Sequence, residues 1–483
     1  MAKDQRASFN TEDWWAVWLG LFIFVLSMGK PLVGMDLLGW IVNTKEYLSL
    51  SSALGPVNGD LALPGIVSLL LTYLFVAVIV TGGGAAMGAN PKRFFCAFSL
   101  IFWFTCACWI AGNWAYIAAT PNKREAFGIG WSLSLTGEAG YIVALLAGII
   151  IGNFAKPLAR YLEPAAKPEW FIKTAIVILG AVAGLKMLDD LGLSKTIVQR
   201  GLCAIIEAYL IYWPVVYLVA RRVFKLTPEW AAPLASGISI CGVSAAIATG
   251  GAIRARPIVP IIVSSLVIVF AVVELVILPF AAQTWLYKEP LVAGAWMGLA
   301  VKTDGAAVAS GAITDSLIRA KALTAQGLTY EKDWITLVAT NTKIFIDLFI
   351  GIWAFVLALI WTYGVEKKPG EKGSLVEIWY RFPKFVIGYA VLFLLVAAVG
   401  KALPTAAEPL KAGFGGAAAL RQLFFALTFF SIGVVSDFGT LKKEGMGKLA
   451  AIYVLCLFGF IIWIGLAVSF LFFHGMVPPL AAG

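Results

Sequence analysis

The chain has 483 residues, of which 60% are hydrophobic and 13% are charged, and its mean hydropathy is +0.88. This composition excludes a soluble globular protein, because the apolar residues gather in runs of about 20, the length needed to cross a bilayer. The net charge of +10 fits basic loops that face anionic lipid. No basic block outside the apolar runs is interleaved with aromatic residues, so nucleic acid is not an expected partner.

Cysteine and histidine usage argues against disulfides, metal centres and cofactors. All six cysteines lie inside apolar runs without a CxxC pair, and the single histidine, His474, lies near the C-terminus. The sequence also contains no GxSxG, Walker A or HExxH motif and no cysteine–histidine pair. We therefore expect neither an enzyme nor an ATP-driven pump.

Hydropathy predicts an all-α polytopic membrane protein with about 11–13 transmembrane helices. The first run begins at Trp14, directly behind Glu12 and Asp13, and is predicted to be an anchor rather than a cleaved signal. Trp40 and Ile41 belong to an amphipathic stretch that we expect at the membrane interface. The predicted helices are 14–28, 64–81, 94–116, 137–154, 171–188, 201–220, 236–253, 257–285, 291–313, 334–363, 382–399, 420–435 and 449–473.

Basic residues concentrate in alternate loops, which by the positive-inside rule places these loops and the N-terminus in the cytoplasm. The difference in positive charge between the two sides is reduced by four basic residues in the opposite loops, Lys123, Arg124, Arg254 and Arg256. The basic loops are 92–93, 156–167, 221–225, 367–384 and 442–448.

The run at 236–253 is interrupted by Gly237, Gly242, Gly250 and Gly251 and carries no charge. In hydrocarbon, unwound backbone survives only where protein or a water-filled cavity surrounds it. A broken helix at this depth therefore predicts a binding site whose amides and half-helix ends hold an ion. The alternative is a tight crossing in which small residues only let two helices touch.

The run at 291–313 is the second irregular segment, with Lys302 and Asp304 in its middle, flanked by Thr303 and Gly305. Each ionisable group at this depth costs roughly 2.5–3.5 kcal/mol and requires a reason. A break next to Gly305 would present both charges to one cavity, where the lysine could neutralise an anion. The aspartate could then be its counter-charge or a proton acceptor. The alternative is a buried ion pair that only fixes packing.

Further charges lie within other predicted helices. Lys343 and Asp347 have i,i+4 spacing, so they either satisfy each other or take part in ion coupling. For isolated charges, pairing or snorkelling is the plainer interpretation, although any of the carboxylates could couple ions. These charges are Glu138, Lys173, Glu207 and Glu274.

A weak sequence similarity between two segments of the chain favours an inverted repeat. The segment 178–180, with its exit at 188–192, is similar to 431–433 with its exit at 441–445. Many transporters contain such repeats, although a chance match is the alternative.

The stretch Ser239-Ile240-Cys241-Gly242-Val243-Ser244-Ala245 resembles the SICGASA signature of the YeiH family of sulfate exporter transporters. The resemblance covers about 137–473. It implies a relationship to bile-acid, arsenite and riboflavin transporters, with crossed broken helices that divide into a core and a panel domain. We accordingly expect residues 1–130 to form an N-terminal extension with about three transmembrane helices, and residues 131–483 to form the transporter domain. Other matches in the family's order are Gly152-Asn153, Ile176 to Gly180 with Leu185, Gly298 to Gly311, Lys343, and Ile432-Gly433 with Asp437 and Leu441.

The sequence departs from the family pattern at the second broken helix. Lys302-Thr303 stands where the family has His-Asp, and Ala306 replaces its glutamine. A fixed positive charge therefore replaces a titratable imidazole, and Asp304 adds a new acid. These changes indicate a rebuilt substrate site.

The sequence thus predicts a secondary active transporter of a small anion, such as sulfate or a sulfonate, in the bacterial inner membrane. The alternatives are a cation/proton antiporter and an uncoupled channel or scaffold. The expected coupling ion is H⁺ or Na⁺. The sequence allows a homodimer but does not decide the oligomeric state. Substrate binding is assigned to Ser239, Cys241, Gly242, Ser244, Lys302 and Thr303. Ion coupling is assigned to Asp304, Glu274, Lys343 and Asp347.

Overall fold

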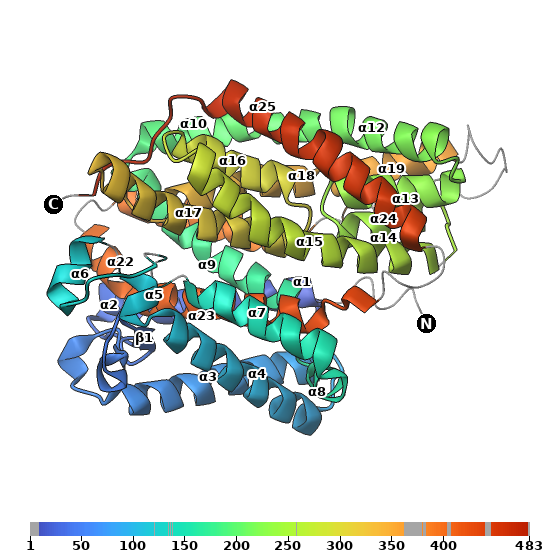
Figure 1. Cartoon of the computed structure of the whole chain (residues 1–483). Helices are drawn as coiled ribbons and strands as arrows, with labels where there is room; N and C mark the ends of the chain where they lie inside the picture. Colours follow the sequence, from blue (N-terminus) through green and yellow to red (C-terminus); the bar gives the residue numbers. More distant parts are fainter. Residues whose placement is uncertain are drawn as a thin grey trace.

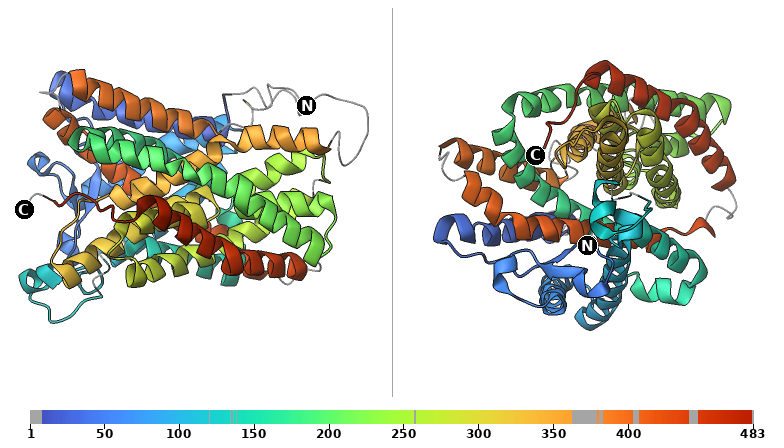
Figure 2. Two further views of the ribbon diagram at one scale, coloured as in Figure 1. Left: turned by 90° about the horizontal axis from the view of Figure 1, so that it is seen from above. Right: turned by 60° about the vertical axis from the view of Figure 1, so that its left-hand side comes forward.

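The computed structural model is an all-α bundle whose long helices run side by side along a common direction (Figures 1 and 2). Within the described residues, ten helical stretches are long and apolar enough to cross a membrane, or eleven if one bent pair counts as a span. Over their described residues, eleven of the thirteen predicted runs correspond to these stretches. The other two, 236–253 and 291–313, are the broken segments. The structure describes residues 9–119, 121–133, 135, 137, 139–256, 258–361, 379, 383–402, 407–439 and 446–481.

The N-terminal part begins with a capped helix, since the side chain of Thr11 accepts a hydrogen bond from the Trp14 amide. The amphipathic stretch after it contains a small antiparallel sheet that pairs Val42 with Pro56. Ile41 beside this sheet is fully buried. The elements of this part are α1 (Glu12–Ser27), α2 (Gly29–Val33), β1 (Val42–Thr44), η2 (Leu50–Ser52), β2 (Leu54–Pro56), η3 (Gly59–Leu61), α3 (Gly65–Ala86), α4 (Pro91–Gly112), α5 (Ala115–Ala118) and α6 (Pro121–Phe127).

The next part contains the bent pair, in which α7 and α8 meet at 115°. It also contains two π-helical segments, a conformation that often marks functional sites. The predicted residue Glu138 lies outside the described residues. The elements here are α7 (Ala139–Phe154), α8 (Lys156–Leu162), α9 (Pro168–Asp189), α10 (Leu191–Gly201), α11 (Cys203–Ile206), η4 (Glu207–Tyr212), α12 (Trp213–Leu218) and η5 (Val219–Val223).

The two broken segments and the C-terminal helices complete the bundle. Most of the basic loop 367–384, and residues 442–445 of the last basic loop, lie outside the described residues. The elements are α13 (Pro228–Ser239), α14 (Val243–Ala252), α15 (Ile258–Trp285), α16 (Pro290–Ala300), α17 (Asp304–Gln326), α18 (Trp334–Leu348), α19 (Ile350–Ile360), α21 (Lys384–Ala402), α22 (Ala407–Gly413), α23 (Gly415–Val435), α24 (Met446–Cys456), η9 (Leu457–Ile461) and α25 (Ile462–Phe473).

Helix α9 occupies the centre of the bundle, where it packs against α1, α21 and α23 (Figure 1). Helices α3 and α4 lie on one side, and α13 to α19 lie on the other. Small residues allow the closest approaches. A Cβ added at Gly148 of α7 would lie 2.2 Å from the Phe430 carbonyl oxygen, and one at Gly433 of α23 would lie 2.4 Å from that of Leu145. Glycine at both positions therefore lets the backbones of α7 and α23 touch. The predicted inverted repeat, the core and panel division and the boundary at 130/131 stay predictions.

Candidate functional site

Both predicted helix breaks are present in the structure. Helix α13 ends at Ser239, and α14 begins at Val243. Helix α16 ends at Ala300, and α17 begins at Asp304. The sequence predicts the second break next to Gly305, but Gly305 lies in the first turn of α17. The break precedes it because Thr303, in an extended conformation, accepts a hydrogen bond from the Ala306 amide and caps the new helix.

Gly242 is required at the first break by its backbone conformation. Its φ of 69° and ψ of −112° belong to a region that L-residues with a side chain rarely adopt. A Cβ added there would lie 2.7 Å from Val267 Cγ1, 3.0 Å from Thr303 Cγ2 and 3.3 Å from the Lys302 carbonyl oxygen. These short distances also show that the two breaks touch each other.

Gly242→Ala is therefore expected to destabilise the protein by about 1–3 kcal/mol, the cost of holding a residue in such a conformation. The thermal unfolding midpoint of the purified protein measures this loss. Gly82→Ala in α3 is a matched control, because a Cβ there would meet no atom within 4 Å. Equal midpoints for the two variants would contradict the requirement for glycine at 242.

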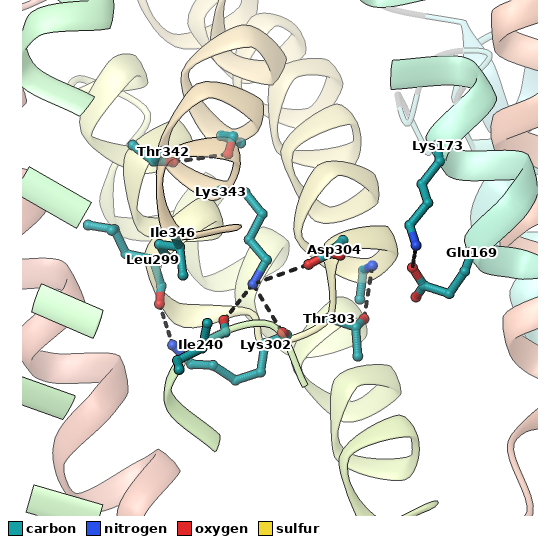
Figure 3. Close-up of polar contacts among 12 residues, drawn as sticks. Glu169, Lys173, Ile240, Leu299, Lys302, Thr303, Asp304, Thr342, Lys343 and Ile346 are labelled. Atoms are coloured by element: carbon teal, nitrogen blue, oxygen red, sulfur yellow. Dashed lines mark hydrogen bonds and ion pairs between the residues drawn. The ribbon is translucent and has the colours of Figure 1, made fainter. Parts of the chain in front are cut away.

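Lys343 of α18 joins the two breaks. Its Nζ donates to the carbonyl oxygens of Ile240, at 2.7 Å, and Lys302, at 3.0 Å, and lies 3.7 Å from Asp304 Oδ1 (Figure 3). The carbonyls at the ends of α13 and α16 carry the partial negative charge of helix C-termini, which an ammonium group neutralises. Lys343 is only 1% exposed, so this compensation occurs inside the protein.

The i,i+4 spacing left open whether Lys343 pairs with Asp347 along one helix, and in the structure its ammonium turns away from Asp347. Instead, Lys343 points across to the two carbonyls, to which its ammonium donates hydrogen bonds, and it forms an ion pair with Asp304 at 3.7 Å. Both carboxylate oxygens of Asp347 are buried and lack a hydrogen-bond partner among the described residues.

A compact acidic cluster lies beside Lys343. Cys241 Sγ and one carboxylate oxygen each of Asp304 and Asp347 lie within 4.8 Å of one another, and all three residues are buried. Two carboxylates this close resist ionising together, because their like charges repel in a low-dielectric interior. The pair is therefore suited to hold one proton or one small cation.

The Lys302 side chain does not join this cluster. Its ammonium donates to the Leu299 carbonyl and lies 4.4 Å from the centre of the Tyr212 ring. The prediction that Lys302 and Asp304 share one cavity as counter-charges is therefore wrong, because Lys343 takes the place beside Asp304.

Glu274 also contacts Lys302. Its Oε2 accepts from the Lys302 amide at 3.0 Å, and its Oε1 accepts from the Tyr453 hydroxyl at 3.3 Å. Both Glu207 carboxylate oxygens are buried without a partner among the described residues. The predicted coupling residues thus divide into two buried clusters.

The serines around the first break have different environments. Ser236 and Thr249 hydrogen-bond to each other across the break at 2.6 Å and so serve packing. Ser239 Oγ is buried without a partner among the described residues. Ser244 is exposed on α14, so only its amide can serve a buried site. No side chain caps the N-terminus of α14.

Glu169 and Lys173 of α9 form a further charged pair, which lies close to the start of α17. The sequence did not reveal this pair as part of the site. Lys173 Nζ lies 2.8 Å from Asp13 Oδ1 and 3.7 Å from Glu169 Oε2. Figure 3 shows Asp304 between Lys343 and this pair, and a Cβ on Gly305 would lie 3.5 Å from Glu169 Oε1. The i,i+4 spacing of Glu169 and Lys173 was the available signal.

The comparisons with known proteins place the chain in a family of membrane proteins. The family model described as "Conserved hypothetical protein 698" matches residues 132–452. A UPF0324 membrane protein of Nitrosomonas europaea is 46% identical over 97% of both chains. The chain belongs to this UPF0324 family. The expected membership of a YeiH-like family fits this match.

Two further relatives match parts of the chain. An uncharacterized protein of Archaeoglobus fulgidus is 55% identical over 30% of this chain and 87% of its own length. A UPF0324 membrane protein of Rhodopirellula baltica is 29% identical over 80% of this chain and 64% of its own. No solved structure matches. Family and fold together identify a multi-pass membrane protein and are consistent with a membrane transporter, whereas the relationship to bile-acid transporters stays a prediction.

Proposed function

We propose that the chain is a secondary active transporter that moves a small oxyanion, such as sulfate or a sulfonate, across the bacterial inner membrane by alternating access. The N-terminus would lie in the cytoplasm. The observation that carries this proposal is the contact between two broken helices at a buried position, with the Lys343 ammonium at their meeting point. Discontinuous helices of this kind form substrate sites in many transporters.

The first break supplies donors for an anion. The first amides of α14 have no side-chain cap, and Ser239 Oγ nearby lacks a partner among the described residues. Amides at a helix N-terminus bind anions through both hydrogen bonds and the helix dipole. Such a site would use the backbone of Gly242 to Ser244 rather than the Lys302 ammonium, which points elsewhere.

Electrostatics supports coupling to protons. We call Lys343, Asp304 and Asp347 the central cluster. With Lys343 charged and both aspartates ionised, this cluster carries one excess negative charge, which opposes an incoming anion. Protonation of one carboxylate removes this charge, so proton binding and anion binding favour each other. A transporter built in this way would carry a proton together with its anion.

A cation/proton antiporter is the second candidate. It is favoured by the proximity of the two aspartate carboxylates to each other and by their unpartnered oxygens. In that mechanism Na⁺ or Li⁺ would displace the shared proton.

Flux through proteoliposomes containing the purified full chain tests the proposal. Saturable counterflow of labelled sulfate, accelerated by an inward proton gradient and independent of Na⁺, is the expected result. Na⁺- or Li⁺-driven proton release without sulfate flux would support the antiporter instead. Absence of any saturable, gradient-driven flux of sulfate, sulfonates or cations would reject both.

A further inference from the structure

Three potential metal ligands converge where the two helix breaks meet α18. Cys241 comes from the first break, Asp304 from the start of α17 and Asp347 from α18. One ligand atom of each residue lies within 4.8 Å of the other two, and all three residues are buried. We call these residues the ligand triad. Spacing along the chain could not indicate the triad, because its members belong to three separate elements.

The Asp347 carboxylate needs a positive partner. No amide, hydroxyl, ammonium or guanidinium group donates a hydrogen bond to either of its oxygens among the described residues, and Asp347 is only 1% exposed. The Lys343 ammonium donates instead to the carbonyls of Ile240 and Lys302 and pairs with Asp304 (Figure 3). A buried charge without a compensating contact is costly. A proton or a cation between the two carboxylates would remove this cost.

The sulfur of Cys241 decides which cation fits the triad. Mg²⁺ and Ca²⁺ take about six or more ligands and prefer oxygen, whereas a thiolate selects Zn²⁺ and similar thiophilic cations. Bonds of about 2.3 Å to sulfur and about 2.0–2.2 Å to oxygen place the ligand atoms of a tetrahedral Zn²⁺ roughly 3.4–3.6 Å apart. The separation in the structure, within 4.8 Å, is close enough for side-chain rotation to bring the three atoms onto one ion.

The sum of charges also suits a divalent cation. With Lys343 charged, both acids ionised and the thiol neutral, the site has one excess negative charge. A divalent cation reverses this excess, and loss of the Cys241 proton to solvent then makes the sum zero. Na⁺ would reach the same sum with the two carboxylates alone, but it would leave the sulfur unused. Lys173, on the other side of Asp304, does not alter the count, because it pairs with Asp13 and Glu169.

We propose that the ligand triad binds one thiophilic divalent cation of the Zn²⁺ class, with a fourth position left to water. The bound cation takes the place of the proton shared by the two carboxylates and ties both helix breaks to α18. It would therefore hold the breaks in the arrangement seen here and oppose alternating access. The binding itself does not depend on the proposed transport, because its ligands are defined by geometry and charge alone.

Co²⁺ tests the site, because it replaces Zn²⁺ in tetrahedral sites and absorbs in the near ultraviolet when a cysteine sulfur coordinates it. The reduced full chain in nanodiscs of zwitterionic lipid should show this absorption band at about one equivalent of Co²⁺, and Zn²⁺ should displace it. Cys241→Ser should abolish the band, because a serine hydroxyl supplies no thiolate. Cys456→Ser is the matched control, since it changes another buried cysteine outside the triad and should retain the band.

Asp347→Asn keeps the cysteine and tests the site even if Cys241→Ser folds poorly. It should weaken Zn²⁺ binding by about tenfold or more, because a neutral amide replaces a charged ligand. Zn²⁺ should also raise the thermal unfolding midpoint of the wild type and of Cys456→Ser, as any ligand of the native state does, and should raise that of Asp347→Asn less.

Two results would overturn the metal site: a Co²⁺–sulfur band that persists in Cys241→Ser or is missing from the wild type, and wild-type Zn²⁺ affinity in Asp347→Asn. These measurements need no transport, so they are separate from the test of the proposed function. A wild-type chain with the band but without flux of any oxyanion would reject the proposed function and retain the metal site. Sulfate flux in a chain without the band would do the reverse.

Discussion

Replacement of Lys343 by methionine is expected to abolish transport and to lower the free energy of unfolding by about 3–5 kcal/mol, the usual loss when one partner of a buried ion pair is removed. The variant leaves the Ile240 and Lys302 carbonyls without their shared donor and Asp304 without its counter-charge. Methionine is similar in length, so the change removes charge rather than volume. Sulfate counterflow and chemical denaturation of the purified protein measure the two effects.

Two variants sharpen this test. Lys167→Met removes the lysine of a half-exposed pair with Glu12 and should cost about 0–1 kcal/mol with transport retained. The double variant Lys343→Met/Asp304→Asn removes both buried charges and should recover part of the lost stability but no flux. Wild-type flux in Lys343→Met would show that the central ammonium has no role in transport.

Asp347→Asn is expected to uncouple transport from protons without unfolding the protein. Its carboxylate lies beside Asp304 and away from the Lys343 ammonium, so the substitution removes the like-charge pair on which proton binding depends. Uptake driven by a proton gradient should fall to background, while exchange of sulfate for sulfate at equal pH continues.

The counterpart Asp304→Asn should behave differently, because Asp304 is the partner of Lys343. It is expected to lower both driven uptake and exchange, as well as the unfolding midpoint. If Asp347→Asn retained full proton-driven uptake, the acidic pair would not be the coupling site, and the Glu207 and Glu274 cluster would become the next candidate.

The cluster of Lys343, Asp304 and Asp347 contains two acids and one lysine and is buried, with Asp304 only 4% exposed. A negative substrate would be admitted there only after one of the two acids is protonated.

The helices and both helix breaks could be predicted from the sequence. Apolar runs of the right length predicted every spanning helix, because hydrocarbon requires each segment to satisfy its own backbone. The glycines and small polar residues at 236–253, together with the charges at 302–304, predicted the breaks, because neither pattern belongs in an ordinary spanning helix. These signals are local in the chain, which is why composition and spacing were sufficient.

The partners of each charge were decided only by the tertiary structure. Lys343 bonds residues 103 and 41 positions away, and Arg421 pairs with a residue 88 positions away. Spacing along one helix allows Lys343 to pair with Asp347, and adjacency allows Lys302 to serve as the counter-charge of Asp304. The structure has neither pairing, because an ammonium is most stable where several acceptors converge, and here they converge from the ends of two different helices. The sequence by itself therefore determined where the membrane helices break, whereas the packing of α13, α16 and α18 determined which charge compensates those breaks.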